Sequence, residues 1–284
     1  MVNFKSILVN LLALSAIGFT SCSHNYYAPN EGVLLALNEK NDVKVSVGGG
    51  ENSSYNNDEE STFSLQGGYS PINHLGVQSS YFTYKGKGTQ NGVAESGNGF
   101  IANAAIGTYY RFPLKKNRSG RERLPDNLAM QRSILIDFYG GYAKGKVHNY
   151  YNPSTNSHFE FNKRFIQLGF HWQGRILGID FTSKFGNLDY STGIVNGKIA
   201  EQHLRDIQNV EKNDSYSFRE NSLRIHIGIR HMRLFMTGTW FNSPKENQVE
   251  FITDNAHFGV IVDIDEFFRK RGAKPGDVIN TLID

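Results

Sequence analysis

The sequence predicts an all-β protein, an antiparallel up-and-down transmembrane β-barrel of about ten strands with an N-terminal lipid-anchored strap. Three observations lead to this fold class. Apolar and polar residues alternate along nearly every structured stretch after residue 42, which is the period of a strand. Short and long connections alternate along the chain, and the apolar faces end in aromatic residues, as in barrels that cross a membrane.

The alternation marks the strands in chain order. Valines alternate with polar residues in the first strand, and in the eighth Leu223 and three isoleucines alternate with Arg224, His226 and Gly228. Other clear stretches of alternation are residues 63–69, 100–110, 177–185 and 258–268. The expected strands are residues 43–49, 61–70, 74–84, 100–112, 133–147, 159–173, 175–188, 217–230, 232–242 and 256–268. A helix is expected only near residues 199–210 and in the last few residues.

The connections favour a membrane barrel. Tight turns are expected at residues 71–73, 173–175 and near His231, and longer polar links at residues 50–60, 85–99, 148–158, 189–216 and 243–255. The basic link 113–132 is the one long connection on the short side. Transmembrane barrels have an even strand count, short periplasmic turns and long outer loops. An even count would return both ends of the barrel to the periplasmic side.

A soluble β-sandwich is the structural alternative, because its buried face would also be apolar. Many of the expected strands are longer than the five or six residues usual in soluble sheets. The apolar faces also end in aromatics such as Tyr110, Trp172 and Trp240, for which a sandwich offers no reason. The barrel is therefore the favoured fold.

The first 21 residues have the composition of an export signal. Lys5 supplies a positive charge, and the apolar run at residues 7–19 is too short for a spanning helix. Cys22, the only cysteine, follows two small residues. This arrangement resembles the lipobox of bacterial lipoproteins, which implies that the signal is cut before Cys22 and that the cysteine is acylated. Several acyl chains would hold the mature protein on a membrane. An ordinary signal with an incidental cysteine is the alternative.

If the apolar face meets lipid, the other face lines the lumen and carries charges of both signs. The expected lumen cluster consists of Arg111, Asp137, Asp180, Arg224, Arg230, Asp263 and Asp265. Small barrels fill their interior with side chains, and buried charges must be paired. A structural salt-bridge network is therefore the favoured interpretation, and a narrow ion-conducting lumen or a substrate site is the alternative.

The sequence offers little support for catalysis, for metal binding or for nucleic-acid binding. The sequence has no G-x-S-x-G elbow, no H-E-x-x-H and no phosphate-binding loop, so neither an activity nor a cofactor nor a metal is expected. A net charge of +3 is too small to suggest nucleic acid. The basic link 113–132 and the basic tail 269–284 suit anionic headgroups of outer-membrane lipid or an acidic envelope partner.

Residues 22–84 resemble a family of Bacteroidetes outer-membrane lipoproteins that have a barrel domain. The matching residues are Tyr27, Pro29, Leu34, Leu35, Glu39, Lys40, Gln66, Tyr69, Gly76 and Val77. The resemblance implies no activity and no catalytic residues. Surface-exported lipoproteins carry a charged run directly after the cysteine, and residues 23–30 lack one. The resemblance therefore implies an anchor in the inner, periplasmic leaflet of the outer membrane.

The sequence thus predicts a non-enzymatic outer-membrane lipoprotein with a structural role, a subunit of a larger envelope complex. Its parts would be a signal peptide (1–21), a periplasmic strap (22–42) under or partly inside the barrel, the barrel (43–268) and the tail (269–284). In the strap, Leu34, Leu35 and Leu37 would pack against the barrel. The alternatives are a narrow channel, a lipid-tethered β-sandwich adhesin and an omptin-like enzyme at the outer mouth.

Overall fold

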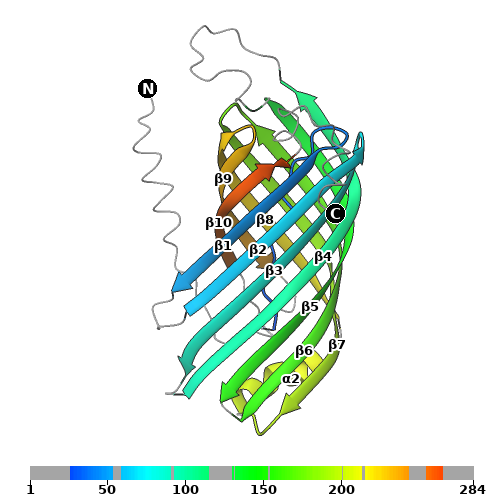
Figure 1. Ribbon diagram of the computed structural model, residues 1–284. Coiled ribbons are helices and arrows are strands. Elements are labelled where there is room, and N and C mark those ends of the chain that lie inside the picture. The colour runs from blue at the N-terminus through cyan, green and yellow to red at the C-terminus, as the bar shows by residue number, and fades with distance from the viewer. Residues whose placement is uncertain are drawn as a thin grey trace, which may run out of the picture.

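The chain folds into one closed antiparallel barrel of ten strands (Figure 1). The computed structural model describes residues 26–53, 59–90, 93–114, 130, 132–152, 154–199, 201–212, 215–242 and 254–264. The predicted signal peptide, Cys22, Asp265 and the basic tail lie outside these residues. In the described part of the chain, no helix is both long and apolar enough to span a membrane.

Each strand pairs with its neighbours in sequence, and β1 pairs with β10 to close the barrel, with Val47 opposite Val260. The strands are β1 (Val43–Ser53), β2 (Glu59–Ile72), β3 (Leu75–Gln90), β4 (Val93–Pro113), β5 (Ser133–Asn152), β6 (Thr155–Gln173), β7 (Leu177–Asn196), β8 (Ser215–Ile229), β9 (Met232–Asn242) and β10 (Asp254–Asp263), with the helix α2 (Glu201–Lys212) between β7 and β8. The ten predicted strands and the helix near residues 199–210 are confirmed, and a single closed sheet excludes the two-sheet sandwich. The helix predicted in the last few residues lies outside the described part of the chain.

Two of the predicted long links are wrong, and two others are shorter than predicted: residues 50–53 and 59–60 pair within β1 and β2, and residues 189–196 belong to β7. Residues 85–90 and 93–99 continue β3 and β4 as a paired hairpin, and residues 148–152 and 155–158 do the same for β5 and β6. The ladder reaches Gln90 opposite Val93. Glycines at residues 86, 88, 97 and 99 carry no side chain, so the apolar–polar alternation fades there although the strand pairing continues.

The two ends of the barrel differ. We use "turn end" for the end with the short hairpin turns at residues 73–74, 174–176 and 230–231, where β1 begins and β10 ends. We use "link end" for the opposite end, where α2 lies across the connection between β7 and β8 (Figure 1). His74 has a positive φ of 66° in its tight turn, a conformation that few non-glycine residues adopt.

The polarity of the barrel is the reverse of a soluble domain. The outer wall exposes large apolar side chains, among them Phe258 at 61% and Leu234 at 60%, whereas lumen-facing Arg224 is 0% exposed. Tyr110 and Phe112 lie on the outer wall near the turn end, and Trp240 lies on it near the link end. The predicted division into an apolar outer face with aromatic ends and a polar inner face is therefore confirmed.

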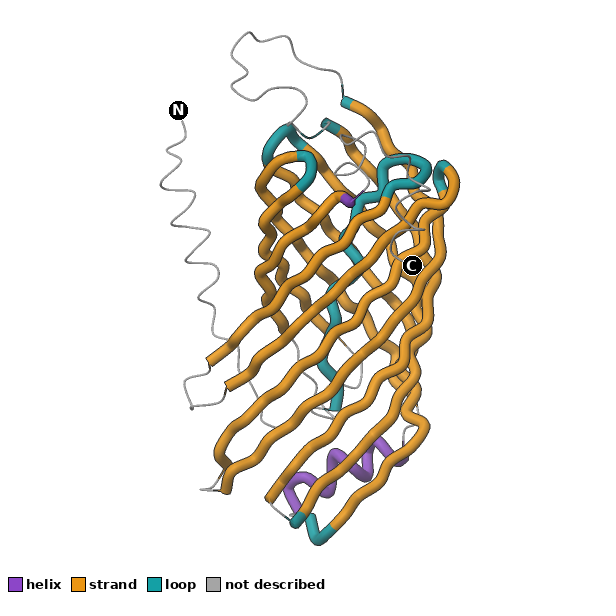
Figure 2. The backbone as a smooth tube through the Cα atoms, viewed as in Figure 1, coloured by secondary structure: helices purple, strands orange, loops and turns teal. Residues whose placement is uncertain are grey.

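The lumen is occupied by the chain's own N-terminal segment, residues 26–38, which we name the plug (Figure 2). Tyr26 contacts Tyr151 near the link end, and Leu37 packs with Tyr109 and Leu135 near the turn end. The predicted packing of Leu34, Leu35 and Leu37 is confirmed, since each is 1% exposed. However, the plug traverses the whole lumen, whereas the sequence predicted a strap that lies under the barrel or only partly inside it.

Candidate functional site: the plugged lumen

The plug is extended and pairs with no strand, so lumen side chains must satisfy its backbone. The Ser222 hydroxyl accepts a hydrogen bond from the Gly32 N–H at 3.1 Å, and the Gln66 side chain bonds both the Gly32 carbonyl and the Leu34 N–H. Lumen side chains also donate to the plug carbonyls of residues 29, 30, 31, 33, 34 and 36. Because unpaired backbone groups are costly when buried, these polar side chains fix the path of the plug.

Aromatic residues hold the plug near the link end. The Tyr26 ring meets Phe159 edge-on at 5.5 Å, and the Tyr190 hydroxyl donates to the Tyr26 carbonyl at 2.8 Å. Tyr27 packs edge-on against Phe161. Tyr26 and Tyr27 are buried in one apolar cluster that also includes residues from α2. This part of the lumen is therefore packed like a protein core.

A buried ionic group lies next to this aromatic layer, on the side of the turn end. Lys163 donates to Glu220 at 2.6 Å, to the Tyr27 hydroxyl at 2.6 Å and to the Asn30 side chain at 3.0 Å. Lys184 lies 3.6 Å from the same glutamate and donates to two plug carbonyls. Two strands of the wall, β6 and β8, are thus tied to each other and to the plug.

Glu31 is the charged residue of the plug that anchors it at mid-depth. Its carboxylate accepts hydrogen bonds from Arg224 at 3.0 Å and from Ser64 at 2.7 Å. Arg224 also donates to Thr237 and lies over the Phe235 ring at 4.1 Å. A buried guanidinium needs a partner charge and further acceptors, and the plug supplies both.

Near the turn end, Lys44 on β1 serves as the corresponding anchor. It donates to the carbonyl of Ala36 and lies 3.1 Å from Asp42 and 3.7 Å from Asp263. Asp42 in turn accepts a hydrogen bond from the Asn38 N–H at 2.6 Å. The chain therefore leaves the lumen through a fixed turn before it enters β1.

His171 lies between two carboxylates in the wall. Its Nε2 is 2.8 Å from Asp137 and its Nδ1 is 3.0 Å from Asp180, which also lies 3.5 Å from His226. Each of these four side chains is 3% exposed or less. Both ring nitrogens of His171 are engaged, so neither is available as a base for a substrate or as a metal ligand. This arrangement favours a structural role.

The predicted lumen charges do not form a single cluster. Asp137, Asp180, Arg224 and Asp263 each pair with a residue outside the predicted set. Arg111 is half-buried near the turn end of β4, and Arg230 lies in the turn after β8. Asp265 lies outside the described residues. Within the part of the chain that the structure describes, no group of histidines, cysteines and carboxylates could hold a metal ion.

Sequence reasoning missed Glu31, Lys163 and Glu220. For the last two a signal was available, because alternation in β6 and β8 puts Lys163 on the face of Gln167 and Glu220 on the face of Arg224. The pairing of His171 with Asp180 also follows from their hairpin register. Glu31 lies in a segment without strand or helix periodicity, so nothing local placed it inside the barrel.

Comparison with known proteins does not assign this chain to a family. No protein-family model matches this chain, and no curated protein matches it significantly. The likeness to Bacteroidetes lipoproteins and the acylation of Cys22 accordingly stay predictions.

Replacement of Lys163 by glutamine should destabilise the barrel by about 3 kcal/mol, because it removes the closest cation from the buried Glu220 and two hydrogen bonds from the plug. Arg164→Gln is the matched control. Arg164 is the next residue, faces outward and pairs with Asp189 with its own side chain 68% exposed, so its loss should cost less than about 1 kcal/mol.

The measurement is the unfolding transition of each variant, followed by the change in electrophoretic mobility on heating in SDS. A closed barrel stays compact in cold SDS and changes its mobility when it unfolds. Equal transition temperatures for the two variants would contradict the anchoring role of Lys163.

Proposed function

We propose that this protein is an outer-membrane β-barrel lipoprotein with a structural role, a non-enzymatic subunit of a larger envelope complex. Three features support a membrane location: the closed barrel leaves no unpaired strand edge, the outer wall is apolar, and aromatic residues lie at both of its margins. Partners would bind outside the lumen, because the plug already takes up its polar side chains.

The single observation that carries this proposal is the plug. Its backbone and Glu31 use the polar groups that would otherwise line a channel. The polar groups suited to proton transfer, around His171, are buried and paired. The geometry therefore favours a scaffold over the narrow channel and over an enzyme with an Asp/His pair at an open outer mouth.

The path of the plug also bears on the leaflet in which a lipid on Cys22 would lie. Tyr26 is at the link end, and Cys22 precedes it by four positions, which span at most about 14 Å of extended chain. The apolar band of such barrels is about 25 Å tall. If the turn end faces the periplasm, a lipid on Cys22 would belong to the outer leaflet. The inner-leaflet anchor that the resemblance implies rested on the lack of a charged run after Cys22, and it remains the alternative.

The wild-type protein should give no steady conductance in planar bilayers, because the plug fills the lumen. Deletion of residues 26–37 should leave a polar lumen and produce ion-conducting events, provided that the variant still migrates as a compact barrel in cold SDS. Sustained conductance by the wild-type protein would instead support the channel alternative.

An epitope inserted after His24 should be accessible to antibody on intact cells, since Tyr26, only two positions later, lies at the link end. The control is the same epitope inserted at Gly174 in the turn between β6 and β7, which should react only after the outer membrane is permeabilised. The opposite pattern would place the link end in the periplasm and restore the inner-leaflet anchor.

A further inference from the structure

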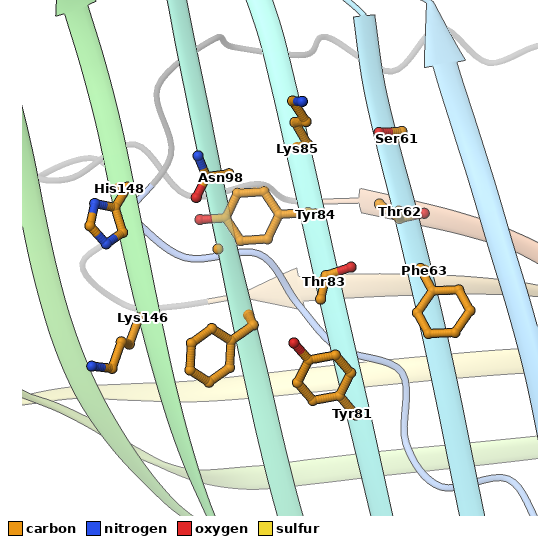
Figure 3. Close-up of a pocket in the computed structure, with 12 residues that line it drawn as sticks. Ser61, Thr62, Phe63, Tyr81, Thr83, Tyr84, Lys85, Asn98, Lys146 and His148 are labelled. Carbon is orange, nitrogen blue, oxygen red and sulfur yellow. The ribbon is translucent and has the colours of Figure 1, made fainter.

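A groove of about 700 Å³ lies on the barrel over β2–β5, towards the link end (Figure 3). Its lining combines cationic and aromatic side chains, including Lys85, Lys146, Phe63, Tyr81 and Phe100. Tyr81 and Phe100 stack at 6.0 Å, and Phe63 and Tyr81 are 44% and 41% exposed. The plug uses none of these outward-facing side chains.

The strand register arranges the outward residues in rows across the four strands. Nearest the link end is a polar row of Ser61, Lys85, Asn98 and His148. The next row towards the turn end is Phe63, Thr83, Phe100 and Lys146, and the one after it is Leu65, Tyr81, Ala102 and Lys144. Outward residues recur every two positions, about 7 Å along a strand. The boundary between the apolar wall and the polar margin therefore passes through the groove.

The lining of the groove on β4 ends at Phe100, and the wall beyond it, towards the turn end, carries small side chains along β4. Its outward residues there are the small Ala102 and Ala104. Larger exposed side chains stand on both sides, with Tyr81 on β3 and Tyr142 on β5, which is opposite Ala104. This shape suits an acyl chain that lies along β4 between two aromatic rings.

The cations that lie towards the link end from these alanines come from both sides of β4. Lys85 on β3 and Lys146 on β5 are two strands and one row apart, about 12 Å between their backbones, so their long flexible side chains can reach one group between them. Lys144 adds a third positive charge. Glu160 offsets part of this charge, since it pairs with Lys146 at 2.5 Å while Lys146 keeps 44% of its side chain exposed.

We propose that this groove binds a lipid with a phosphate-bearing headgroup from the leaflet at the link end, with the phosphate between Lys85 and Lys146 and an acyl chain over Ala102 and Ala104. Charge complementarity and the position at the apolar–polar boundary favour this occupant over a soluble anion, which would make no contact with the apolar wall along Ala102 and Ala104. The inference rests on the proposed membrane location.

The test is native mass spectrometry of the full-length protein in detergent, titrated with bis-phosphorylated lipid A and with the same lipid after dephosphorylation. We expect one tightly bound phosphorylated lipid and about tenfold weaker binding of the dephosphorylated one. Lys85→Gln and Lys146→Gln should each weaken binding of the phosphorylated lipid about five- to tenfold. Arg219→Gln on the outer wall of β8, away from the groove, should leave it unchanged.

Equal binding of both lipids, or equal binding by all three variants, would overturn the inference. Fractionation with the outer membrane and the mobility shift in SDS test the membrane location separately. If the protein fails those two tests, the proposed function falls and the lipid site with it. If it passes them and the lipids are not distinguished, only the lipid site is wrong.

Discussion

The structure depends on the need to hydrogen-bond an extended chain buried inside a closed barrel. The plug makes no sheet pairs, yet its N–H and carbonyl groups lie out of water, where each unpaired group would cost about 1–3 kcal/mol. Lumen side chains from β2, β6, β7 and β8, such as Gln66, Gln167, Lys184 and Ser222, take the place of a neighbouring strand. Gly32 passes so close to Thr182 that a β-carbon would overlap its side chain. Wall and plug are therefore a matched pair.

The same constraint explains why so many charged residues can be buried. Lys163, Lys184 and Arg224 would be severely destabilising in an empty apolar lumen, but each meets a carboxylate and plug or wall acceptors. An ionic lumen and an apolar outer wall then follow from one alternation, because successive side chains of each strand point in turn to the lumen and to the outside. Closure of β1 against β10 seals the plug inside, because both strands flank the lumen that it crosses.

The strands were predictable because period-two alternation is a local signal, and the outward face of this barrel repeats it from Val45 to Val262. The signal failed at the β3–β4 and β5–β6 hairpins, where mostly glycine and polar residues continue the ladder and the apolar–polar alternation is lost. The lumen face was predictable, but its pairing was not, because partners such as Glu31 and Arg224 are 193 residues apart. The path of the plug was not predictable either, since an irregular segment carries no periodicity and its place is set by the barrel around it.

The central claim is that the plug passes through the lumen, and an engineered disulfide tests it most directly. A β-carbon on Gly68 would lie 3.5 Å from that of Leu35, within the range of a disulfide. The pair Leu35→Cys with Gly68→Cys should therefore cross-link in the folded protein, which mass spectrometry of the linked peptides would detect. The control is Leu35→Cys with Gly67→Cys, in which the second cysteine is on the same strand but faces outward beside Ser79. A high yield for the first pair and little for the second is the result we predict. No cross-link in the first pair, or equal yields in both, would contradict the plugged lumen.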